Sequence, residues 1–475
     1  MSGKPDPKDK FVGIQISPIS FLDEGVDTVL DTLQSRVGVN VLMLGTVSWL
    51  GLKTGRSISW QLDGWPDHGV PEPFAMTGGA YFDPDPAYYG GTFMKDYRTR
   101  DPQFDGKDIL KMVLPAAHAR GMKVYIELME PFFKYTGHGS VNTVDIPNLA
   151  QAMEIDIFGR IGSDPSTSNP GYRNWILSMI EDQVRNHDID GVMWCNERNS
   201  PLDTLIQGGA PGDFSTHARR EAMERGIDVE ACRKALLNLY DFMQEAKSGK
   251  TFADGAFVTF LRTLLANPEA LIWERFWLER NKDLDRELYG LVKWCKPSLP
   301  FGLNVWNRNH FNIFRKAQWP WEEQTLYADW VKPITYQHQA GEVFAKELGF
   351  FQKTILRDFS PDEATAVLYR LLGLTEAPYA SVIQSGMDPD TYVEGQCADA
   401  VRGVNGKAKV FMGIGVDAPR TRADQAQCTP DIAYRSVMAT YRAGGDGIVL
   451  APNYASMKLT NLDGVAKALT ELGLK

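Results

Sequence analysis

The sequence predicts a (β/α)8 TIM barrel, an α/β fold in which eight parallel strands close on themselves. Eight short apolar, β-prone segments occur along the chain, and runs with helical periodicity separate nearly all of them. This alternation predicts parallel strands joined by right-handed crossovers, and eight units favour closure of the sheet. An open doubly wound sheet is the alternative, but no glycine-rich GxGxxG motif follows the first strand.

The boundaries of these elements follow from apolar runs and from helical spacing. The predicted strands are residues 11–20, 40–49, 122–129, 191–195, 301–306, 331–336, 409–416 and 447–451. The predicted helices between and after them are residues 26–37, 108–120, 172–187, 342–356, 361–372, 429–443 and 462–472. Pro333 argues against the sixth strand, because proline cannot donate a hydrogen bond to a neighbouring strand.

Three long segments interrupt the regular alternation. They cover about 50–106, 131–170 and 199–299, and the last of them has mostly helical patterning. Each follows one of strands two, three and four, so all three should lie on the face where barrel enzymes bind their substrates. We expect a short tail at 1–10 and a single barrel at 11–475.

The composition favours a soluble globular enzyme. The chain has 475 residues, of which 43% are hydrophobic and 23% are charged. A net charge of −10 without a lysine- or arginine-rich block argues against nucleic acid as a partner. The absence of a run of eighteen apolar residues predicts no membrane span. Five cysteines without CxxC spacing indicate neither a zinc ribbon nor a disulfide framework.

The compartment stays open at this stage. Residues 1–10 contain no apolar signal segment, but a signal peptide removed beforehand would leave the same pattern. Cytoplasmic, periplasmic and secreted locations therefore all fit the sequence. The oligomeric state is open as well.

The fourth predicted strand ends in a polar tip. It reads Asp-Gly-Val-Met-Trp-Cys-Asn-Glu-Arg over 190–198, so Asn196 and Glu197 follow the apolar residues Trp194 and Cys195. The end of a strand is where a (β/α)8 barrel places its catalytic groups. Apolar neighbours favour the neutral form of a carboxyl and would raise the pKa of Glu197.

This tip resembles the corresponding motif of the clan A glycoside hydrolases. That superfamily places its acid/base glutamate after an asparagine at the end of strand four and its nucleophilic glutamate at the end of strand seven. Strand seven here ends in Asp417 rather than in glutamate. The resemblance implies that Glu197 is the general acid/base, that Asp417 is the nucleophile or second base, and that Asn196 binds a sugar hydroxyl. Residues 117–124 and 444–449 are also similar to stretches in poorly characterised glycosyl-hydrolase-like barrel families.

Glu127 and Glu130 lie near the end of strand three and are the reserve for the second carboxyl, since glycoside hydrolysis needs two. Structural roles compete with each assignment. Glu127 would otherwise be a buried, paired acid, and Glu130 a solvated loop acid. Glu197 would otherwise form an ion pair with Arg198 or another arginine, and Asp417 would otherwise cap a helix or a turn.

Polar and aromatic residues at other strand ends suit sugar recognition, because flat rings stack on sugar C–H surfaces and amides bind hydroxyls. Trp194, Asn196 and Glu130 join this group from the segments described above. The remaining candidates are Trp49, Asn304, Trp306, Arg308, Tyr336, His338, Asn453 and Tyr454. Ordinary barrel packing is the alternative for Trp306 and Tyr336, and a pairing with Glu197 is one alternative for Arg308.

The sequence therefore predicts a glycosidase that acts on a carbohydrate without a cofactor. A metal-dependent sugar isomerase, epimerase or lyase is the first alternative, with a site built from His310, His338, Glu197 and Asp417. Strand one contains no HxH pair, which counts against the amidohydrolase pattern. A non-catalytic carbohydrate-binding barrel is the second alternative. Neither a GxSxG elbow nor a GxxxxGK[ST] phosphate loop occurs.

Overall fold

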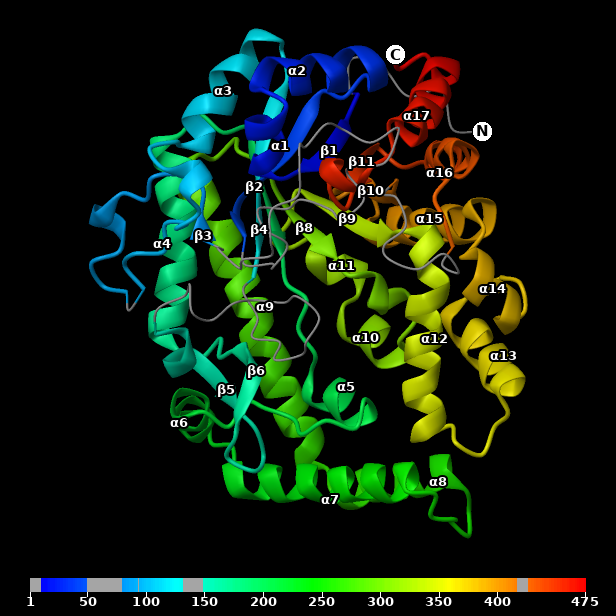
Figure 1. Cartoon of the computed structure of the whole chain (residues 1–475). Helices are drawn as coiled ribbons and strands as arrows, with labels where there is room; N and C mark the ends of the chain where they lie inside the picture. The colour runs from blue at the N-terminus through cyan, green and yellow to red at the C-terminus, as the bar shows by residue number, and fades with distance from the viewer. Residues whose placement is uncertain (1–9, 49–78, 93, 131–147, 417–425) are drawn as a thin grey trace.

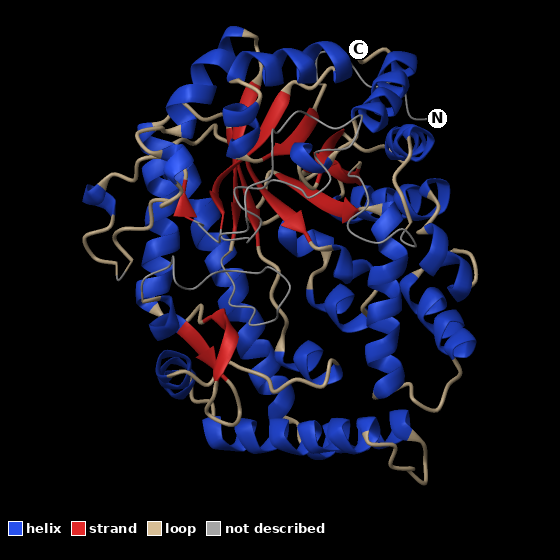
Figure 2. Ribbon diagram, viewed as in Figure 1, coloured by secondary structure: helices blue, strands red, loops and turns tan. Residues whose placement is uncertain are grey.

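The computed structural model describes residues 10–48, 79–92, 94–130, 148–416 and 426–475, and within this part of the chain it shows a closed barrel of eight parallel strands (Figures 1 and 2). Its first strand, β1, pairs with β2 on one side and with β11 on the other, which closes the sheet. The eight strands are β1 (Val12–Ile16), β2 (Val41–Ser48), β4 (Lys123–Met129), β7 (Gly191–Cys195), β8 (Phe301–Val305), β9 (Trp330–Thr335), β10 (Lys409–Gly415) and β11 (Gly447–Ala451). The predicted fold class is confirmed, and every barrel strand overlaps a predicted one.

Strand β9 exists despite Pro333. Its register with β10 pairs Val331 with Val410 and Ile334 with Gly413, and the two positions between have no paired partner there. On its other side, Pro333 lies opposite Val305 of β8. The missing N–H of the proline thus falls in an unpaired stretch of the ladder, which is where a strand tolerates proline.

The alternation of side chains along each strand separates two apolar regions. Residues such as Val12, Ile14 and Ile16 of β1 point outward and join the core between the strands and the surrounding helices. Inward-pointing residues form a smaller apolar layer inside the barrel, in which the rings of Phe11 and Phe411 stack with centroids 3.7 Å apart. The members of this inner layer are Phe11, Val41, Met43, Tyr125, Met193, Trp330, Phe411 and Val449.

Helices surround the barrel and cover its outward-facing side chains (Figure 2). Several of them begin at a side chain that caps the first turn, for example Asp108, Asn169 and Thr429. These helices are α1 (Pro18–Asp23), α2 (Val26–Asp31, continued by a π-helical turn at Thr32–Val37), α3 (Ile109–Ala119), α4 (Pro170–Asn186), α15 (Glu394–Val404), α16 (Pro430–Arg442) and α17 (Leu459–Leu472). The helices that follow β9, whose buried apolar residues pack in a separate core, are α12 (Gln337–Lys353), α13 (Pro361–Leu372) and α14 (Tyr379–Ser385). The sequence did not predict α14 and α15.

A second apolar core lies in the segment that follows β7 and the helices that pack on it. In Figure 1, α7 and α8 lie farthest from the barrel, and α9 runs from them back toward it. The helices between β7 and β8 are α5 (Pro201–Ile206), α6 (Thr216–Glu224), α7 (Val229–Lys247), α8 (Ala256–Ala266) and α9 (Glu269–Cys295). After β8, α10 (Ile313–Gln318) packs on the second core, and α11 (Trp321–Gln324) packs on the outer core through Trp321.

Two small strand pairings complete the fold. Strand β3 (Gly79–Ala80) pairs antiparallel with the end of β2, and β5 (Met153–Ile155) pairs antiparallel with β6 (Ile161–Pro165). Among the helices of the described residues, none is both long enough and apolar enough to cross a membrane.

Candidate active site

The inside of the barrel changes from apolar to polar toward the carboxyl ends of the strands. The polar residues that bond to one another there come from β1, β4, β7, β8 and β9, which lie far apart in the sequence. We call this set the mouth cluster; its members are Gln15, Glu127, Cys195, Glu197, Asn304, Lys332 and Tyr336. This end of a barrel is the one at which barrel enzymes carry out their chemistry.

Lys332 lies at the centre of the mouth cluster and is completely buried. Its Nζ donates hydrogen bonds to Gln15 Oε1 at 2.7 Å and to Asn304 Oδ1 at 2.9 Å, and the hydroxyl oxygen of Tyr336 is 3.4 Å away. Gly413 on β10 makes room for this side chain, because a Cβ at that position would lie 2.8 Å from Lys332 Cε. Burial lowers the pKa of Lys332 to about 8, while the nearby Glu127 acts in the opposite direction.

Glu127 is the carboxyl of the mouth cluster on β4, and its Oε1 accepts a hydrogen bond from Gln15 Nε2. Burial raises the pKa of Glu127 to about 7. The positive charge of Lys332 and the bond from Gln15 oppose this rise, whereas the negative charge of Glu197 adds to it. Glu127 is thus placed to hold a proton near neutral pH.

Glu197 follows β7 directly and approaches the cluster through Cys195. The thiol of Cys195 donates to Glu197 Oε1 over 3.5 Å, and Asn304 Nδ2 lies 2.9 Å from the same sulfur. Cys195 and Asn304 occupy paired positions on the neighbouring strands β7 and β8, which explains this contact. The charge of Glu197 acts on Glu127, on Lys332 and on Cys195, so the two carboxyls belong to one electrostatic site.

Glu130, a predicted sugar ligand, is buried rather than a solvated loop acid, so that alternative was wrong. Its carboxylate accepts hydrogen bonds from Tyr172 Oη at 2.5 Å and from Arg198 Nε at 2.6 Å. The guanidinium of Arg198 also lies 3.5 Å from Glu154. Glu130 therefore serves as the anchor of Arg198, the buried arginine that was one alternative partner for Glu197.

Trp194, Tyr454 and Asn453, three further predicted sugar ligands, bond outside the mouth cluster. The indole N–H of Trp194 donates to Asp285 of α9 at 2.9 Å, because Trp194 points outward from β7. Tyr454 is buried in the outer core and bonds to Glu24 at 3.2 Å. The side chain of Asn453 accepts hydrogen bonds from the backbone N–H groups of Ser17 and Ala455.

Trp306 and Arg308 follow β8 and belong to a charged network above the barrel. Arg308 and Arg315 share the buried carboxylate of Asp203, at 3.3 and 3.1 Å, and Arg308 also pairs with Glu347. Both guanidinium carbons lie over the ring of Trp306, at 4.8 and 4.7 Å from its centroid. Arg308 therefore holds this network together through Asp203 and Glu347, and the ring of Trp306 is fixed in place.

His338 and Asn196 complete the predicted residues that the structure describes. His338 is buried against the end of β10, where a Cβ on Gly415 would lie 2.7 Å from its Cε1. Burial raises the pKa of Asp285, and Asn196, which lies beside that carboxyl, opposes this rise. The predicted residues Asp417 and Trp49 lie outside the described residues.

The proposed metal ligand His310 packs in the second core, where its Nδ1 lies 2.9 Å from the hydroxyl of Tyr392. Burial lowers the pKa of His310 to about 3. Within the described ranges, no group of three or more histidine, cysteine, aspartate or glutamate side chains is arranged to hold a metal ion.

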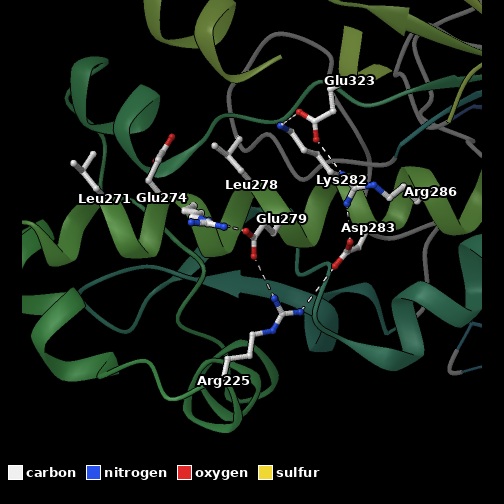
Figure 3. A pocket seen from close by; sticks show the side chains of 10 residues that line it. Arg225, Leu271, Glu274, Leu278, Glu279, Lys282, Asp283, Arg286 and Glu323 are labelled. Atoms are coloured by element: carbon white, nitrogen blue, oxygen red, sulfur yellow. Dashed lines mark hydrogen bonds and ion pairs between the residues drawn. The ribbon is translucent and has the colours of Figure 1, made fainter. Parts of the chain in front are cut away.

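A cavity of about 550 Å³ lies along α9, away from the mouth cluster (Figure 3). Its lining combines Leu271 and Leu278 with charged side chains from α9, Arg225 and Glu323 of α11. Figure 3 shows these charges paired with one another, for example Arg225 with Glu279 at 3.5 Å. A neighbouring cavity of about 480 Å³ has a more apolar lining that includes Ile313 and Phe314.

Sequence reasoning missed two central members of the mouth cluster, Gln15 and Lys332. Both were visible as polar residues inside apolar strand segments, in FVGIQIS and VKPITY. A buried lysine or glutamine is uncommon without a partner, so such positions signal a polar network. What the sequence did not contain was the identity of the partners, which come from other strands.

A closed barrel of eight parallel strands with two carboxyls at its mouth defines the class of structure to which the chain belongs. No family model and no curated protein matches the sequence. Among solved structures, the β-galactosidase from the psychrophilic Marinomonas ef1 shares the fold with a TM-score of 0.50 and 11% sequence identity, over 98% of this chain and 61% of that chain. The β-galactosidase from Bacillus circulans sp. alkalophilus gives a TM-score of 0.50 and 12% identity, over 98% and 56%.

A third solved structure is matched over almost its full length. The PgaB (BpsB) glycoside hydrolase domain from Bordetella bronchiseptica gives a TM-score of 0.49 and 11% identity, over 97% of this chain and 98% of that chain. The present chain spans less than two thirds of the length of the two β-galactosidases. At these identities the two β-galactosidases show a shared (β/α)8 fold.

Proposed function

We propose that this chain is a glycoside hydrolase that uses Glu127 and Glu197 as its pair of carboxyls. The observation that carries the proposal is their placement: both lie at the carboxyl end of the barrel and act electrostatically on each other. Glycoside hydrolysis needs one protonated and one ionised carboxyl on opposite sides of the scissile bond. The two β-galactosidases that share the fold are consistent with this chemistry.

The proposed roles follow from the surroundings of each group. Desolvation of the half-buried Glu127 raises its pKa to about 7, so it holds the proton that the leaving oxygen takes up. Glu197 supplies the ionised carboxylate, which attacks the anomeric carbon or activates a water molecule. This assignment exchanges the roles expected from the resemblance, in which Glu197 is the acid/base. Asp417, the partner expected from the sequence, stays the alternative second carboxylate.

The test is an assay of the wild-type protein on a panel of aryl glycosides that covers both anomers and includes a β-galactoside. Glu127→Gln and Glu197→Gln should each lower kcat by at least about 100-fold, because each removes a proton-transfer or charge-stabilising group. Glu224→Gln is the matched control, since Glu224 is an exposed glutamate on α6 whose nearest ion pair is a loose 3.8 Å.

Two outcomes would overturn the proposal. Full activity in both variants would show that these carboxyls do not carry the reaction. Tight binding of an intact sugar without turnover, unchanged in Glu197→Gln, would instead identify a carbohydrate-binding barrel. In a retaining enzyme, an external nucleophile such as azide separates the two roles by the configuration of the glycosyl azide formed: an alanine variant of the nucleophile gives the inverted anomer, whereas an alanine variant of the acid/base gives the retained anomer.

A further inference from the structure

We infer that Lys332 is a positioning residue that orients both proposed catalytic carboxyls, because two hydrogen-bond chains lead from its ammonium group to Glu127 and to Glu197. The inference rests on the proposed function, since it concerns the same two carboxyls. Lys332 is well suited to this place because an ammonium group only donates hydrogen bonds and thereby fixes the direction of every bond that follows.

The first chain runs through Gln15. Lys332 Nζ donates to Gln15 Oε1 at 2.7 Å, and Gln15 Nε2 donates in turn to Glu127 Oε1. A carboxamide can do both only when its oxygen faces the ammonium group and its nitrogen faces the carboxylate. The lysine therefore determines which way Gln15 is turned, and Gln15 holds one oxygen of Glu127.

The second chain runs through Asn304 and Cys195. Asn304 Oδ1 accepts from Lys332 Nζ at 2.9 Å, which turns Asn304 Nδ2 toward the sulfur of Cys195 at 2.9 Å. The sulfur then receives a hydrogen bond on one side and directs its own proton to Glu197 Oε1, 3.5 Å away. Because burial raises the pKa of Cys195, the thiol keeps this proton.

The charges that face Lys332 agree with this role. Glu127 on β4, Cys195 on β7 and Glu197 after β7 are the titratable groups that favour its charged form. A buried ammonium group is costly unless it is hydrogen-bonded and lies near opposite charge, and Lys332 meets both conditions. Lys332 also lowers the pKa of Glu127 against the effect of burial, so it tunes the carboxyl that it positions.

The first test measures the titration of Glu127 in the full-length protein without substrate. Carbon-13 NMR of side-chain-labelled glutamate serves for this, and the signal is assigned by its loss in Glu127→Gln. Lys332→Met should raise the pKa of Glu127 by about one unit or more, because a neighbouring cation is removed. Lys407→Met is the control, since Lys407 is an exposed lysine before β10, and it should leave this pKa unchanged.

An unchanged pKa of Glu127 in Lys332→Met would overturn the inference. The titration of Glu127 does not depend on the proposed function, because it is measured without substrate. If the wild-type protein cleaves no glycoside, the proposed function is wrong, but the effect of Lys332 on the pKa of Glu127 can still be measured. Lys332→Arg keeps the charge and should leave the pKa of Glu127 close to its wild-type value, which would not be so if the shift in Lys332→Met came from a general loss of packing.

The second test keeps the charge of Lys332 and interrupts one chain. Asn304→Leu removes the link to Cys195 and Glu197, and it serves even if Lys332→Met does not fold. Asn304→Leu should lower kcat on the cleaved glycoside at least 10-fold, because a small displacement of a reacting group slows the reaction strongly. The pKa of Glu127 should stay within a few tenths of a unit of its wild-type value, because the charge of Lys332 is kept. Full activity in Asn304→Leu would show that this chain does not position Glu197.

Discussion

Glu130 and Arg198 form a buried ion pair in which Arg198 Nε and Nη2 lie 2.6 and 2.5 Å from the two carboxylate oxygens of Glu130. Both side chains are almost completely covered, with 1% and 2% of their surface exposed. Arg198, which follows Glu197 in the sequence, is thus held by Glu130. Glu130 and Glu197 follow the neighbouring strands β4 and β7, but Glu130 lies in this buried ion pair and Glu197 lies in the mouth cluster.

The first prediction concerns the stability of this pair. Glu130→Gln should lower the free energy of unfolding by about 3–5 kcal/mol, because it removes the carboxylate that holds the buried guanidinium of Arg198 at two points. The double change Glu130→Met with Arg198→Met should cost less than Glu130→Gln alone, since no uncompensated charge remains. Denaturant unfolding measures both.

Asp463→Asn is the control for this prediction. It removes a two-point contact with Arg36, but 37% and 50% of the two side chains are exposed, so it should cost less than about 1 kcal/mol. Equal losses in Glu130→Gln and Asp463→Asn would contradict the importance given to burial.

The second prediction concerns pH. Burial raises the pKa of Asp285 from 3.8 to about 7 in the folded protein, although the indole of Trp194 donates to it. Between these two values the folded state binds more protons than the unfolded state, so stability should fall as the pH rises from about 4 to 7. The ionisation of Asp285 should lower the free energy of unfolding by up to about 4 kcal/mol in total as the pH rises through this range.

Asp285→Asn removes the titrating group and keeps an acceptor for Trp194. The difference in unfolding free energy between this variant and the wild type should therefore shift in favour of the variant as the pH rises from 4 to 7. Thermal and denaturant unfolding at several pH values measures it. A constant difference across this range would mean that Asp285 is ionised throughout in the folded protein.

The third prediction concerns the packing inside the barrel. A Cβ on Gly302 would lie 2.0 Å from Trp330 Cε2, and the ring of Trp330 is held by the rings of Phe11, Tyr125 and Phe411. Gly302→Ala should therefore destabilise the protein by about 3 kcal/mol or prevent it from folding.

Gly290→Ala provides the opposite result for comparison. Gly290 lies inside α9, and a methyl group added at its Cα would have no heavy atom of the surrounding structure within 4 Å. Alanine should therefore stabilise the protein by about 1 kcal/mol through helix propensity. A destabilisation of similar size in both variants would argue against the inner layer as described.

The fourth prediction concerns sugar binding. The two guanidinium groups of Arg308 and Arg315 hold the ring of Trp306 next to Ile334 and Tyr336 at the end of the barrel. If this ring stacks on the substrate, Trp306→Ala should raise KM about 10-fold, which corresponds to an aromatic contact of about 1.4 kcal/mol. Trp294→Ala is the control, because Trp294 is 79% exposed at the end of α9. An unchanged KM in Trp306→Ala would assign that ring to packing alone.

The sequence by itself determined the eight barrel strands, because each is a short apolar run bounded by turns and such local patterns reflect which backbone segments must be buried. It also placed Glu127 and Glu197 at strand ends, since strand ends follow directly from strand positions. Polar residues such as Glu130 and Arg308 could not be assigned in this way, because either a substrate or a buried counter-charge satisfies the same side chain.

Only the tertiary structure decided which polar groups meet. Lys332 and Gln15 are 317 positions apart in sequence, and closure of the sheet alone brings them within 2.7 Å. Neighbouring residues of a strand face opposite sides of the sheet. In the closed barrel, Trp194 therefore points outward to α9, and Cys195 points into the barrel. Local sequence sets the strands, whereas the pKa of Glu127 depends on burial and on charges contributed by distant segments.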